Sequence, residues 1–359
     1  MARIIYGVSG QGFGHSTRSR EVLSYLKEQG HDLMVFTYDQ GLFFLEKDFK
    51  TFEVPGLGLI YKNNKLQYWH TILRNIKQVA KQSRHWNKIL NTFRDFKPDL
   101  VITDFEPLTV LLAKLMRLPL ISLDNQHQIT NTKISLPLKY RKDLMAVKLV
   151  IKSMVWGANY YVVTSFFRSE VKRKDTAVFE SILRQEIFDL KPIKGDFILL
   201  YQTAGFEKMI DKIKALPYRF VVFGFNKEMT DGNIEYKEYS HKEWLQYLAS
   251  CRAIVATAGL SLISEAIYLN KPYFAIPVKK QIEQVINAYY LEKMGCGVHA
   301  DVFDLSKFVN FMDNLPKYEA KLVAIQQKDN SALLAKLSEL IAELTAVHHP
   351  VFTKSKNLL

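Results

Sequence analysis

Cysteine is scarce in this sequence. Only Cys251 and Cys296 occur among 359 residues, and both lie in apolar or glycine-rich surroundings. A disulfide framework needs several paired cysteines, and a thiolate metal site needs a cluster of them. The composition therefore argues against both, and it fits a reducing compartment such as the cytoplasm.

Long apolar runs are also missing. Charged residues interrupt each candidate, as Lys114 does near Leu111 and Lys152 does near Ile151. Because a spanning helix needs about 20 consecutive apolar residues, we expect no membrane span. The apolar segment at residues 1–7 is too short for a secretory signal peptide. We expect a cytoplasmic protein, and peripheral attachment to the inner face of the membrane stays open.

The balance of residue types is that of a globular protein, with 48% hydrophobic and 24% charged residues. The length suffices for two domains, each with its own core. The formal charge of +13 favours an anionic partner, whether a nucleotide, a phospholipid surface or a nucleic acid. No RNA- or DNA-binding signature is present and the aromatic residues lie in apolar runs, so we expect no nucleic-acid partner.

Alternating apolar runs and helical stretches predict an α/β fold with parallel sheets. The first apolar run, 3–9, leads into the glycine-rich turn Gly10-Gln11-Gly12-Phe13-Gly14-His15 and then a helix, which is the opening of a nucleotide-type βαβ unit. The same order restarts at 197–205. We therefore expect an N-terminal domain at 1–185, a C-terminal domain at 186–335, and a helix and tail at 336–359 that could pack back on the N-terminal domain.

Two neighbouring strands of the first domain deliver polar residues at their carboxyl ends. The run 100–103 is followed by Asp104, and the run 120–123 is followed by Asp124, Asn125, Gln126 and His127. Ligands of open parallel sheets bind at this edge. Asp104 could equally be the N-cap of the helix that follows it.

The stretch 251–297 reads as strand, turn, helix, strand, loop and helix. Gly259 would let a ligand approach the backbone closely, and the helix starting near Ser261 would direct unpaired N–H groups at an anion. Glu265, inside that helix, and Glu283 and Gln284, at the start of the next one, could reach the same space. Carboxylates and amides there suit a polyol ligand.

Residues 66–93 predict a long amphipathic helix with a basic outer face. Such a face is usually just solvated. Alternatively, it and the basic run 139–142 could lie against an anionic membrane that presents a lipid-linked acceptor.

Taken in order, these motifs resemble those of the GT-B glycosyltransferases, and of their MurG-like group (glycosyltransferase family 28) in particular. The matching segments are Gly12 to His15, Gly205, Gly259 to Ala266, and Glu283-Gln284 with Asn287-Ala288. The resemblance implies two Rossmann-like, doubly wound domains that face each other across a cleft. It also implies a metal-independent, inverting transfer without a cofactor, from a UDP-sugar to an acceptor such as a lipid-linked or cell-envelope glycan.

The resemblance further assigns the donor site. Glu265 corresponds to the acid that binds the ribose hydroxyls, Glu283 and Gln284 to the pair that contacts the donor sugar, and the segment Tyr239-Ser240 to the strand end that meets the base. The turns that flank the diphosphate hold Gly12, Gly14, Gly205 and Gly259. Where the family usually has a phosphate-binding Thr or Ser, this chain has Leu262, with Ser261 one place earlier.

Transfer of a sugar needs a base for the acceptor hydroxyl and an offset for the charge of the leaving diphosphate. His15 has a suitable residue type for the base, and a carboxylate behind it would fix its tautomer. Asp104 is our candidate for that carboxylate, and Asn125 and His127 are candidates for acceptor binding. A UDP-sugar 2-epimerase on the same fold is the alternative function.

Overall fold

The structure is a computed structural model that describes residues 1–56, 61–62, 65–66, 83–201, 207–325 and 328–347. The chain divides into two compact units. Unit 1 comprises Met1–Ile182 and Asn330–Leu359, and unit 2 comprises Leu183–Asp329. The expected first boundary, 185/186, lies three residues beyond the boundary between the two units, 182/183. The chain re-enters unit 1 at Asn330, so the whole of the last helix belongs to that unit.

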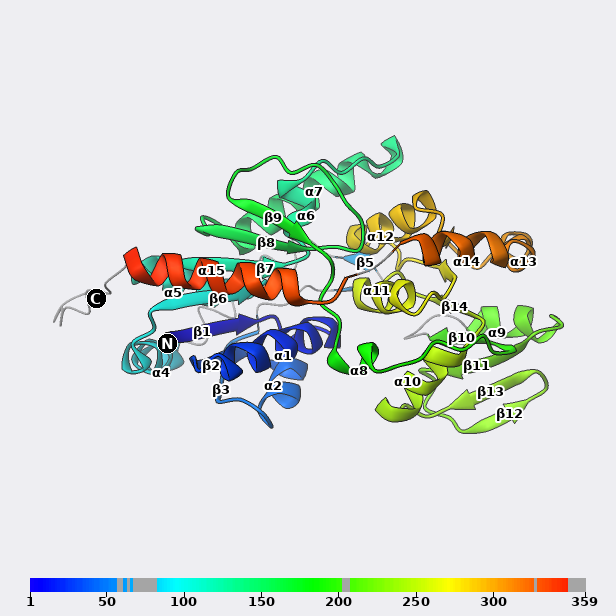
Figure 1. Cartoon of the computed structure of the whole chain (residues 1–359), viewed down its shortest axis with the longest axis horizontal. Coiled ribbons are helices and arrows are strands. Elements are labelled where there is room, and N and C mark those ends of the chain that lie inside the picture. The colour runs from blue at the N-terminus through cyan, green and yellow to red at the C-terminus, as the bar shows by residue number, and fades with distance from the viewer. Residues whose placement is uncertain (57–60, 63–64, 67–82, 202–206, 326–327, 348–359) are drawn as a thin grey trace. The chain divides into compact units, whose positions relative to one another are not determined.

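Unit 1 is built on a seven-stranded sheet whose strands all run parallel (Figure 1). Its strands, in spatial order, are β3 (Thr51–Glu53), β2 (Asp32–Thr37), β1 (Arg3–Val8), β6 (Leu100–Asp104), β7 (Leu120–Asp124), β8 (Tyr160–Thr164) and β9 (Thr176–Phe179). The central strands are buried on both faces, which explains why they read as continuous apolar runs.

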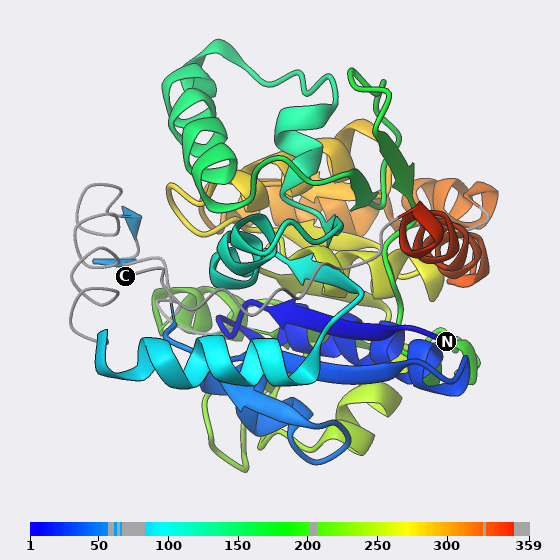
Figure 2. The same cartoon turned by 90° about the vertical axis from the view of Figure 1, so that its left-hand side faces the viewer.

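Helices flank this sheet on both sides (Figure 2). They are α1 (Phe13–Glu28), α2 (Asp39–Leu45), α4 (Ser83–Phe96), α5 (Pro107–Leu115), α6 (His127–Asn131), α7 (Arg141–Met154) and α15 (Ser331–Val347), with a 3₁₀ turn η1 at Leu138–Tyr140. A separate hairpin is formed by β4 (Tyr61–Lys62) and β5 (Lys65–Leu66).

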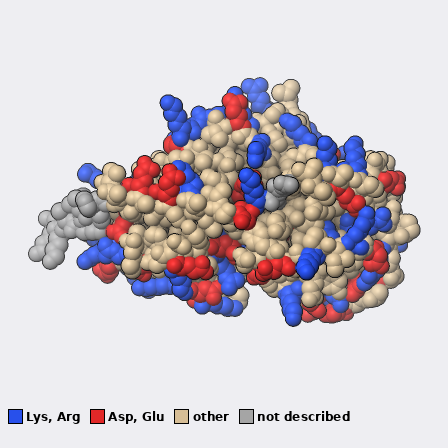
Figure 3. Space-filling model, viewed as in Figure 1, with Lys and Arg blue, Asp and Glu red and all other residues tan. Residues whose placement is uncertain are grey.

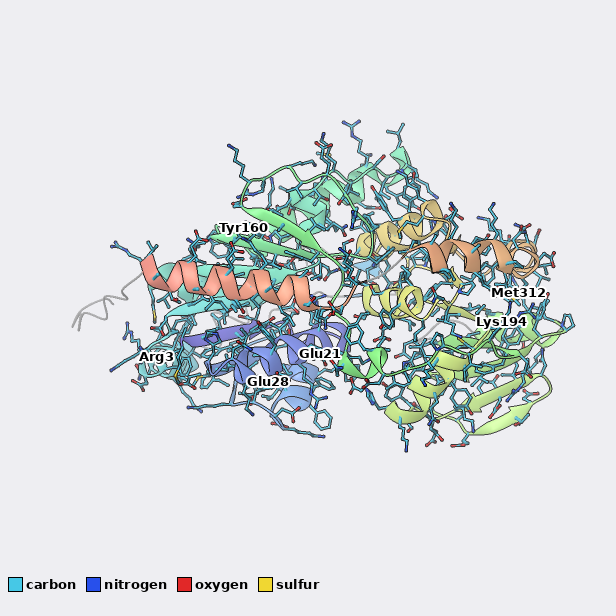
Figure 4. All side chains as sticks on the ribbon, viewed as in Figure 1. Arg3, Glu21, Glu28, Tyr160, Lys194 and Met312 are labelled. Atoms are coloured by element: carbon cyan, nitrogen blue, oxygen red, sulfur yellow. The ribbon has the colours of Figure 1, made fainter. Side chains whose placement is uncertain are left out.

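The last helix belongs to the core of the first unit. On α15, Leu333, Leu337 and Leu340 are buried in one apolar cluster with residues of β1, β6 and α1. Lys336 places its Nζ 5.5 Å from the ring centroid of Tyr160, which Figure 4 labels at the start of β8. Residues more than 300 positions apart therefore share one hydrophobic core.

Unit 2 repeats the same plan with a second seven-stranded sheet. Its strands, in spatial order, are β12 (Met229–Asp231), β13 (Ile234–Lys237), β11 (Arg219–Phe223), β10 (Phe197–Tyr201), β14 (Ala253–Ala256), β15 (Tyr273–Ala275) and β16 (Gly297–His299). Only the pairing of edge strand β12 with β13 is antiparallel. Its helices are α8 (Gln185–Phe188), α9 (Glu207–Lys214), α10 (His241–Ser250), α11 (Leu260–Tyr268), α12 (Ile282–Lys293), α13 (Leu305–Asp313) and α14 (Leu315–Ala324).

Aromatic rings fill the core of unit 2. Phe274 of β15 packs against Phe308 and Phe311 of α13, with ring centroids 5.6 Å apart in each pair. Phe220 of β11 completes this group on the same face of the sheet. Burial of such large rings supplies much of the packing energy of a domain, so unit 2 has its own core.

The predicted helix at 66–93 is wrong at its start, because Leu66 ends the hairpin strand β5. Residues 67–82 lie outside the described residues, and the helix that the structure does describe, α4, extends to Phe96. Among the described helices, none has both the length and the apolar character that crossing a membrane would require.

Candidate functional site

The sheet of unit 1 changes its direction of winding between β1 and β6. The chain passes from β1 to β2 on one side, while β6 pairs with β1 on the other. Ligands of doubly wound sheets bind outside the carboxyl ends of the strands at such a switch point. The segments that emerge there are Ser9 to Gly12 after β1 and Asp104 to Glu106 at the end of β6.

Helix α1 begins inside the glycine-rich motif. Gly12 is its N-cap residue, with a φ of 82°, a backbone conformation that favours glycine. The helix then starts at Phe13, so Gly14 is helical and His15 lies in the first turn. The motif therefore positions His15 on a rigid element rather than on a loop.

His15 and Asp104 meet at the switch point. Nδ1 of His15 lies 2.8 Å from Oδ1 of Asp104, whose side chain is completely buried. The His15 ring is half-buried, and its second nitrogen, Nε2, lies 3.4 Å from Nε2 of Gln126. The contact that the sequence predicted between this histidine and this carboxylate is thus present.

Arg18 is the second partner of Asp104. Its Nε donates to Oδ2 of Asp104 at 2.7 Å and its Nη2 donates to Oδ1. Ser19 adds a hydrogen bond from Oγ to Oδ2 at 3.1 Å. Burial acts to raise the pKa of the Asp104 carboxyl, but Arg18 and His15 outweigh it and lower that pKa to about 2. Asp104 is therefore an anion at every pH at which the protein would work.

Asp104 does not cap the helix that follows it. The N-cap of α5 is Glu106, which accepts hydrogen bonds from the backbone N–H groups of Leu108 and Thr109 at 3.0 and 2.7 Å. The alternative interpretation of Asp104 as an N-cap is therefore wrong. A capping residue two positions later leaves the Asp104 carboxylate available to His15 and Arg18.

Asn125 and His127 are both buried and both engaged within unit 1. Oδ1 of Asn125 accepts from Nη1 of Arg18 at 2.7 Å. His127 lies 2.7 Å from Oδ2 of Asp124 through its Nδ1 and stacks near Tyr161, with centroids 4.6 Å apart. Asn125 and His127 are 4% and 3% exposed. The acceptor-binding role of both residues stays a prediction.

The corresponding position in unit 2 is the end of β14. Gly259 is the N-cap of α11 with a φ of −69°, a conformation open to any residue, and a Cβ added there would meet no atom within 4 Å. The turn before it is held from two sides, since Tyr273 Oη donates to the carbonyl of Thr257 at 2.5 Å and Asn287 Nδ2 donates to that of Ala258 at 3.0 Å. Among the residues that the structure describes, no atom lies within 4 Å of that Cβ, so the N-terminus of α11 could accept an anion there.

Glu265 of α11 is buried and paired with Arg184. The pair is a two-pronged ion pair, with Nε to Oε1 and Nη2 to Oε2 both at 2.8 Å. Nη1 of Arg184 also lies 3.1 Å from Nε2 of His241. A buried carboxylate in an apolar helix is costly without a partner, and Arg184 is that partner. A bidentate pair fixes the carboxylate orientation.

For the other predicted donor-site residues, the structure gives positions and a few contacts within unit 2. Tyr239 is half-exposed and Ser240 is the N-cap of α10, whose carbonyl accepts from Trp244 N at 2.8 Å. Glu283 lies in the first turn of α12, and Gln284 Oε1 accepts from Val278 N at 2.9 Å. Ser261 and Leu262 both occupy the first turn of α11 and are partly buried. Gly205 lies outside the described residues.

Sequence reasoning missed the two arginines. Arg18 follows His15 by three positions on the same helix, a spacing that places both on one face, and this signal could have been used. Arg184 is 81 positions before Glu265, and nothing in the sequence links the two. In the described part of the chain, no group of His, Cys, Asp or Glu side chains could hold a metal ion.

Two doubly wound sheets in successive units are the architecture of the GT-B glycosyltransferases, as the sequence predicted. The profile of glycosyl transferase family 1 matches residues 2–316, and the chain belongs to that family. It is therefore a glycosyltransferase.

Its relatives agree with this assignment. The chain is 23% identical over 322 residues to an uncharacterized glycosyltransferase of Methanosarcina acetivorans, covering 82% of this chain and 84% of the relative. It is 24% identical over 276 residues to the UDP-N-acetylglucosamine–N-acetylmuramyl-(pentapeptide) pyrophosphoryl-undecaprenol N-acetylglucosamine transferase of Thermosipho melanesiensis, covering 72% and 76%. Among solved structures, Phytolacca americana UGT2 complexed with UDP-2-fluoro-glucose and pterostilbene is similar with a TM-score of 0.67 at 11% identity, covering 95% of this chain and 99% of that one.

Proposed function

We propose that this glycosyltransferase moves a sugar from a UDP-sugar to an acceptor hydroxyl, with inversion at the anomeric carbon and without a metal ion. The observation that carries the proposal is the 2.8 Å contact between His15 Nδ1 and Asp104 Oδ1 at the switch point of unit 1. An imidazole oriented through one nitrogen by a buried carboxylate has its other nitrogen left as a proton acceptor.

The reaction follows from these parts. The acceptor oxygen attacks the anomeric carbon while its proton passes to Nε2 of His15, and the bond from that carbon to the diphosphate oxygen breaks. Attack and departure on opposite faces invert the configuration. Asp104 stays ionised throughout and stabilises the imidazolium that forms.

Unit 2 offers the donor site. The open N-terminus of α11 beside Gly259 suits the diphosphate, because its N–H groups and partial positive charge offset the charge of the leaving group. Glu265, held by Arg184, presents carboxylate oxygens that suit the ribose hydroxyls. The name of the Thermosipho relative specifies UDP-N-acetylglucosamine, and the Phytolacca structure is a complex with UDP-2-fluoro-glucose, which supports UDP as the nucleotide.

A thermal-shift panel of UDP, GDP, TDP and CDP, with and without EDTA, tests the donor. A ligand that binds only the folded protein raises its melting temperature by mass action. We expect UDP to give the largest shift and EDTA to leave it unchanged. A larger shift with another nucleotide would remove the UDP assignment, and a shift lost in EDTA would remove metal independence.

The transferase and the 2-epimerase interpretations differ in what happens without an acceptor. The family match supports the transferase. When the protein is incubated with UDP-N-acetylglucosamine alone, we expect the donor to remain intact. Conversion of the whole pool to an epimer or to free UDP and sugar would instead favour the 2-epimerase.

We further propose that the acceptor is lipid-linked and that α7 contacts the membrane that presents it. Helix α7 buries one residue, Ile151, among its 14. Leu138, Met145 and Leu149 are 83%, 60% and 70% exposed, and the latter two share one helix face. An exposed apolar stripe of this kind is typical of helices that lie in a membrane interface.

Basic residues surround this stripe. They are Lys139, Arg141, Lys142, Lys148 and Lys152. Figure 3 shows Lys and Arg side chains projecting along the upper edge of the view, where α7 lies in Figure 1. Partial burial and then the charges of Lys172 and Lys152 lower the pKa of Lys148, so positive charge is crowded here. This charge complements anionic lipid headgroups, and the undecaprenol in the name of the Thermosipho relative is a lipid.

Sedimentation with vesicles tests the contact. We expect binding to vesicles with 30% phosphatidylglycerol at low salt, and loss of that binding in the double variant Met145→Glu/Leu149→Glu. Val323→Glu is the matched control, because Val323 is an apolar residue of α14 with 67% exposure. Binding by the double variant as strong as that of the wild type would remove α7 as the membrane-contacting face.

A further inference from the structure

Asp104 has a permanently charged partner in Arg18, independently of His15. Arg18 donates hydrogen bonds to both carboxylate oxygens, from Nε and Nη2, and its Nη1 donates to Oδ1 of Asn125 at 2.7 Å. A guanidinium stays protonated in proteins. The buried negative charge of Asp104 is therefore neutralised by Arg18, and the pair needs no second cation.

The same arginine lies against the imidazole. Nη2 of Arg18 is 2.8 Å from Nδ1 of His15, the atom that is also 2.8 Å from Asp104 Oδ1. A protonated His15 would bring a second positive charge into contact with Arg18, whereas neutral His15 leaves the cluster balanced. Gln126, which lies 3.4 Å from Nε2 of this ring, is uncharged.

Two further titratable groups of the described residues lie near the cluster, and neither changes this balance. The phenol of Tyr6 on β1 is completely buried beside Asp104 and Arg18, and burial raises its pKa far above neutral pH, so it stays uncharged. Asp124, at the end of β7, has its own partner in His127. The net charge that His15 meets is thus set by Asp104 and Arg18 together.

We propose that Arg18 is a positioning residue that keeps His15 in its neutral, proton-accepting form. Its guanidinium supplies the counter-charge of Asp104, so the carboxylate can accept Nδ1–H from His15 without drawing a second proton onto Nε2. In a histidine and carboxylate pair without the arginine, the carboxylate would stabilise the imidazolium more strongly, so a larger fraction of the ring would already be protonated and unable to accept a proton. The catalytic part of this inference rests on the proposed function.

The protonation of His15 can be measured without any substrate. In protein labelled with ¹⁵N-histidine, long-range ¹H–¹⁵N correlation spectra distinguish the Nδ1–H tautomer, the Nε2–H tautomer and the imidazolium, and His15→Gln assigns the signal. We expect the wild type to show neutral, Nδ1-protonated His15 at pH 7.5. In Arg18→Met, the midpoint of the His15 titration should rise by on the order of one pH unit or more, because the opposing charge is gone.

Two further variants separate charge from structure. Arg18→Lys retains the charge, so its midpoint should stay near that of the wild type although the two-pronged grip on Asp104 is lost. Arg18→Met/Asp104→Asn removes both charges and should also return the midpoint towards the wild-type value, and it stays informative if the single Met variant does not fold. A midpoint that does not move in folded Arg18→Met, or that moves equally in Arg18→Lys, would overturn the proposal.

Kinetics then connect the titration to turnover. We expect the acidic limb of the kcat/KM profile to move in Arg18→Met by the same amount as the His15 titration, with the KM for the donor unchanged. An acidic limb that stays in place while the titration moves would remove the catalytic role of Arg18. Absence of turnover of UDP-sugars by the wild type would count against the proposed function but would leave the titration result standing.

Discussion

His15 and Asp104 are 89 positions apart in the sequence, yet Nδ1 of the imidazole lies 2.8 Å from Oδ1 of the carboxylate. The contact joins the first turn of α1 to the end of β6, two elements that are fixed by the central strands of unit 1. Because both residues are carried by rigid elements, their separation is a property of the fold itself.

Replacement of the imidazole should separate binding from chemistry. We expect His15→Ala to retain the UDP-induced thermal shift, because the donor-site residues of unit 2 are untouched, and to lose turnover by on the order of a hundredfold or more. Steady-state kinetics with a UDP-sugar measures the loss. Near-normal turnover would exclude His15 as the base.

Glu265 should be required for UDP binding. We expect Glu265→Ala to abolish the UDP-induced thermal shift and to lower stability as well, because Arg184 would be left buried without its carboxylate. The double variant Arg184→Met/Glu265→Met removes both charges and serves as the control. It should regain stability without regaining UDP binding, and UDP binding by a stable double variant would contradict the ribose role.

A side chain at position 259 should lower the affinity for UDP and leave the fold intact. The φ of −69° and the open space around a Cβ make Gly259→Val compatible with the backbone. A less favourable N-cap should cost about 1 kcal/mol or less of stability. Isothermal titration should nevertheless show UDP affinity reduced tenfold or more. Equal affinity in the folded variant would mean that the diphosphate lies elsewhere.

Glu106 should make stability depend on pH. Burial raises the pKa of its carboxyl to about 7, although the N–H groups of Thr109 and Leu108 act to lower it. Between an ordinary value of about 4.5 and 7, the folded state holds a proton that the unfolded chain has released, so stability falls as pH rises through that window. The loss is about 3 kcal/mol.

Urea unfolding at pH 5 and pH 8 measures this dependence in the wild type and in Glu106→Gln. The glutamine does not titrate, so the variant should lose most of the decline between the two pH values. The same decline in both proteins would show that Glu106 is not its source. Asp104 contributes in a different range, because its low pKa gives stability that is lost only as pH falls from about 4 towards 2.

Local patterns sufficed for the sheets and for half of the site in unit 1. The buried strands of both units are continuous apolar runs. Asp104 directly follows such a run and His15 follows the glycine-rich turn after another, so both are predicted at the edge of the sheet where ligands bind. The start of α1 was placed too late, because glycines at 12 and 14 read as a loop until the φ of Gly12 shows a helix cap.

The arginines could not be found in the same way. Arg18 and Arg184 read as surface charges, and only tertiary contact with Asp104 and Glu265 shows that they are buried counter-ions. The surface that α7 presents could not be predicted in this way either. Periodicity can show that a helix has an apolar face, but it does not show whether a core covers residues such as Met145 and Leu149.

The packing of α15 against β1 and β6 bears on how the chain is made. Unit 1 cannot cover that face of its sheet until residues 331–347 have been synthesised, whereas every described strand and helix of unit 2 precedes them in the chain. Domains usually complete their folding from the N-terminus onward, but this topology allows the core of unit 1 to close only after the whole of unit 2 has been synthesised. Until then, one face of the first sheet lacks its last helix and exposes apolar residues that a chaperone could bind.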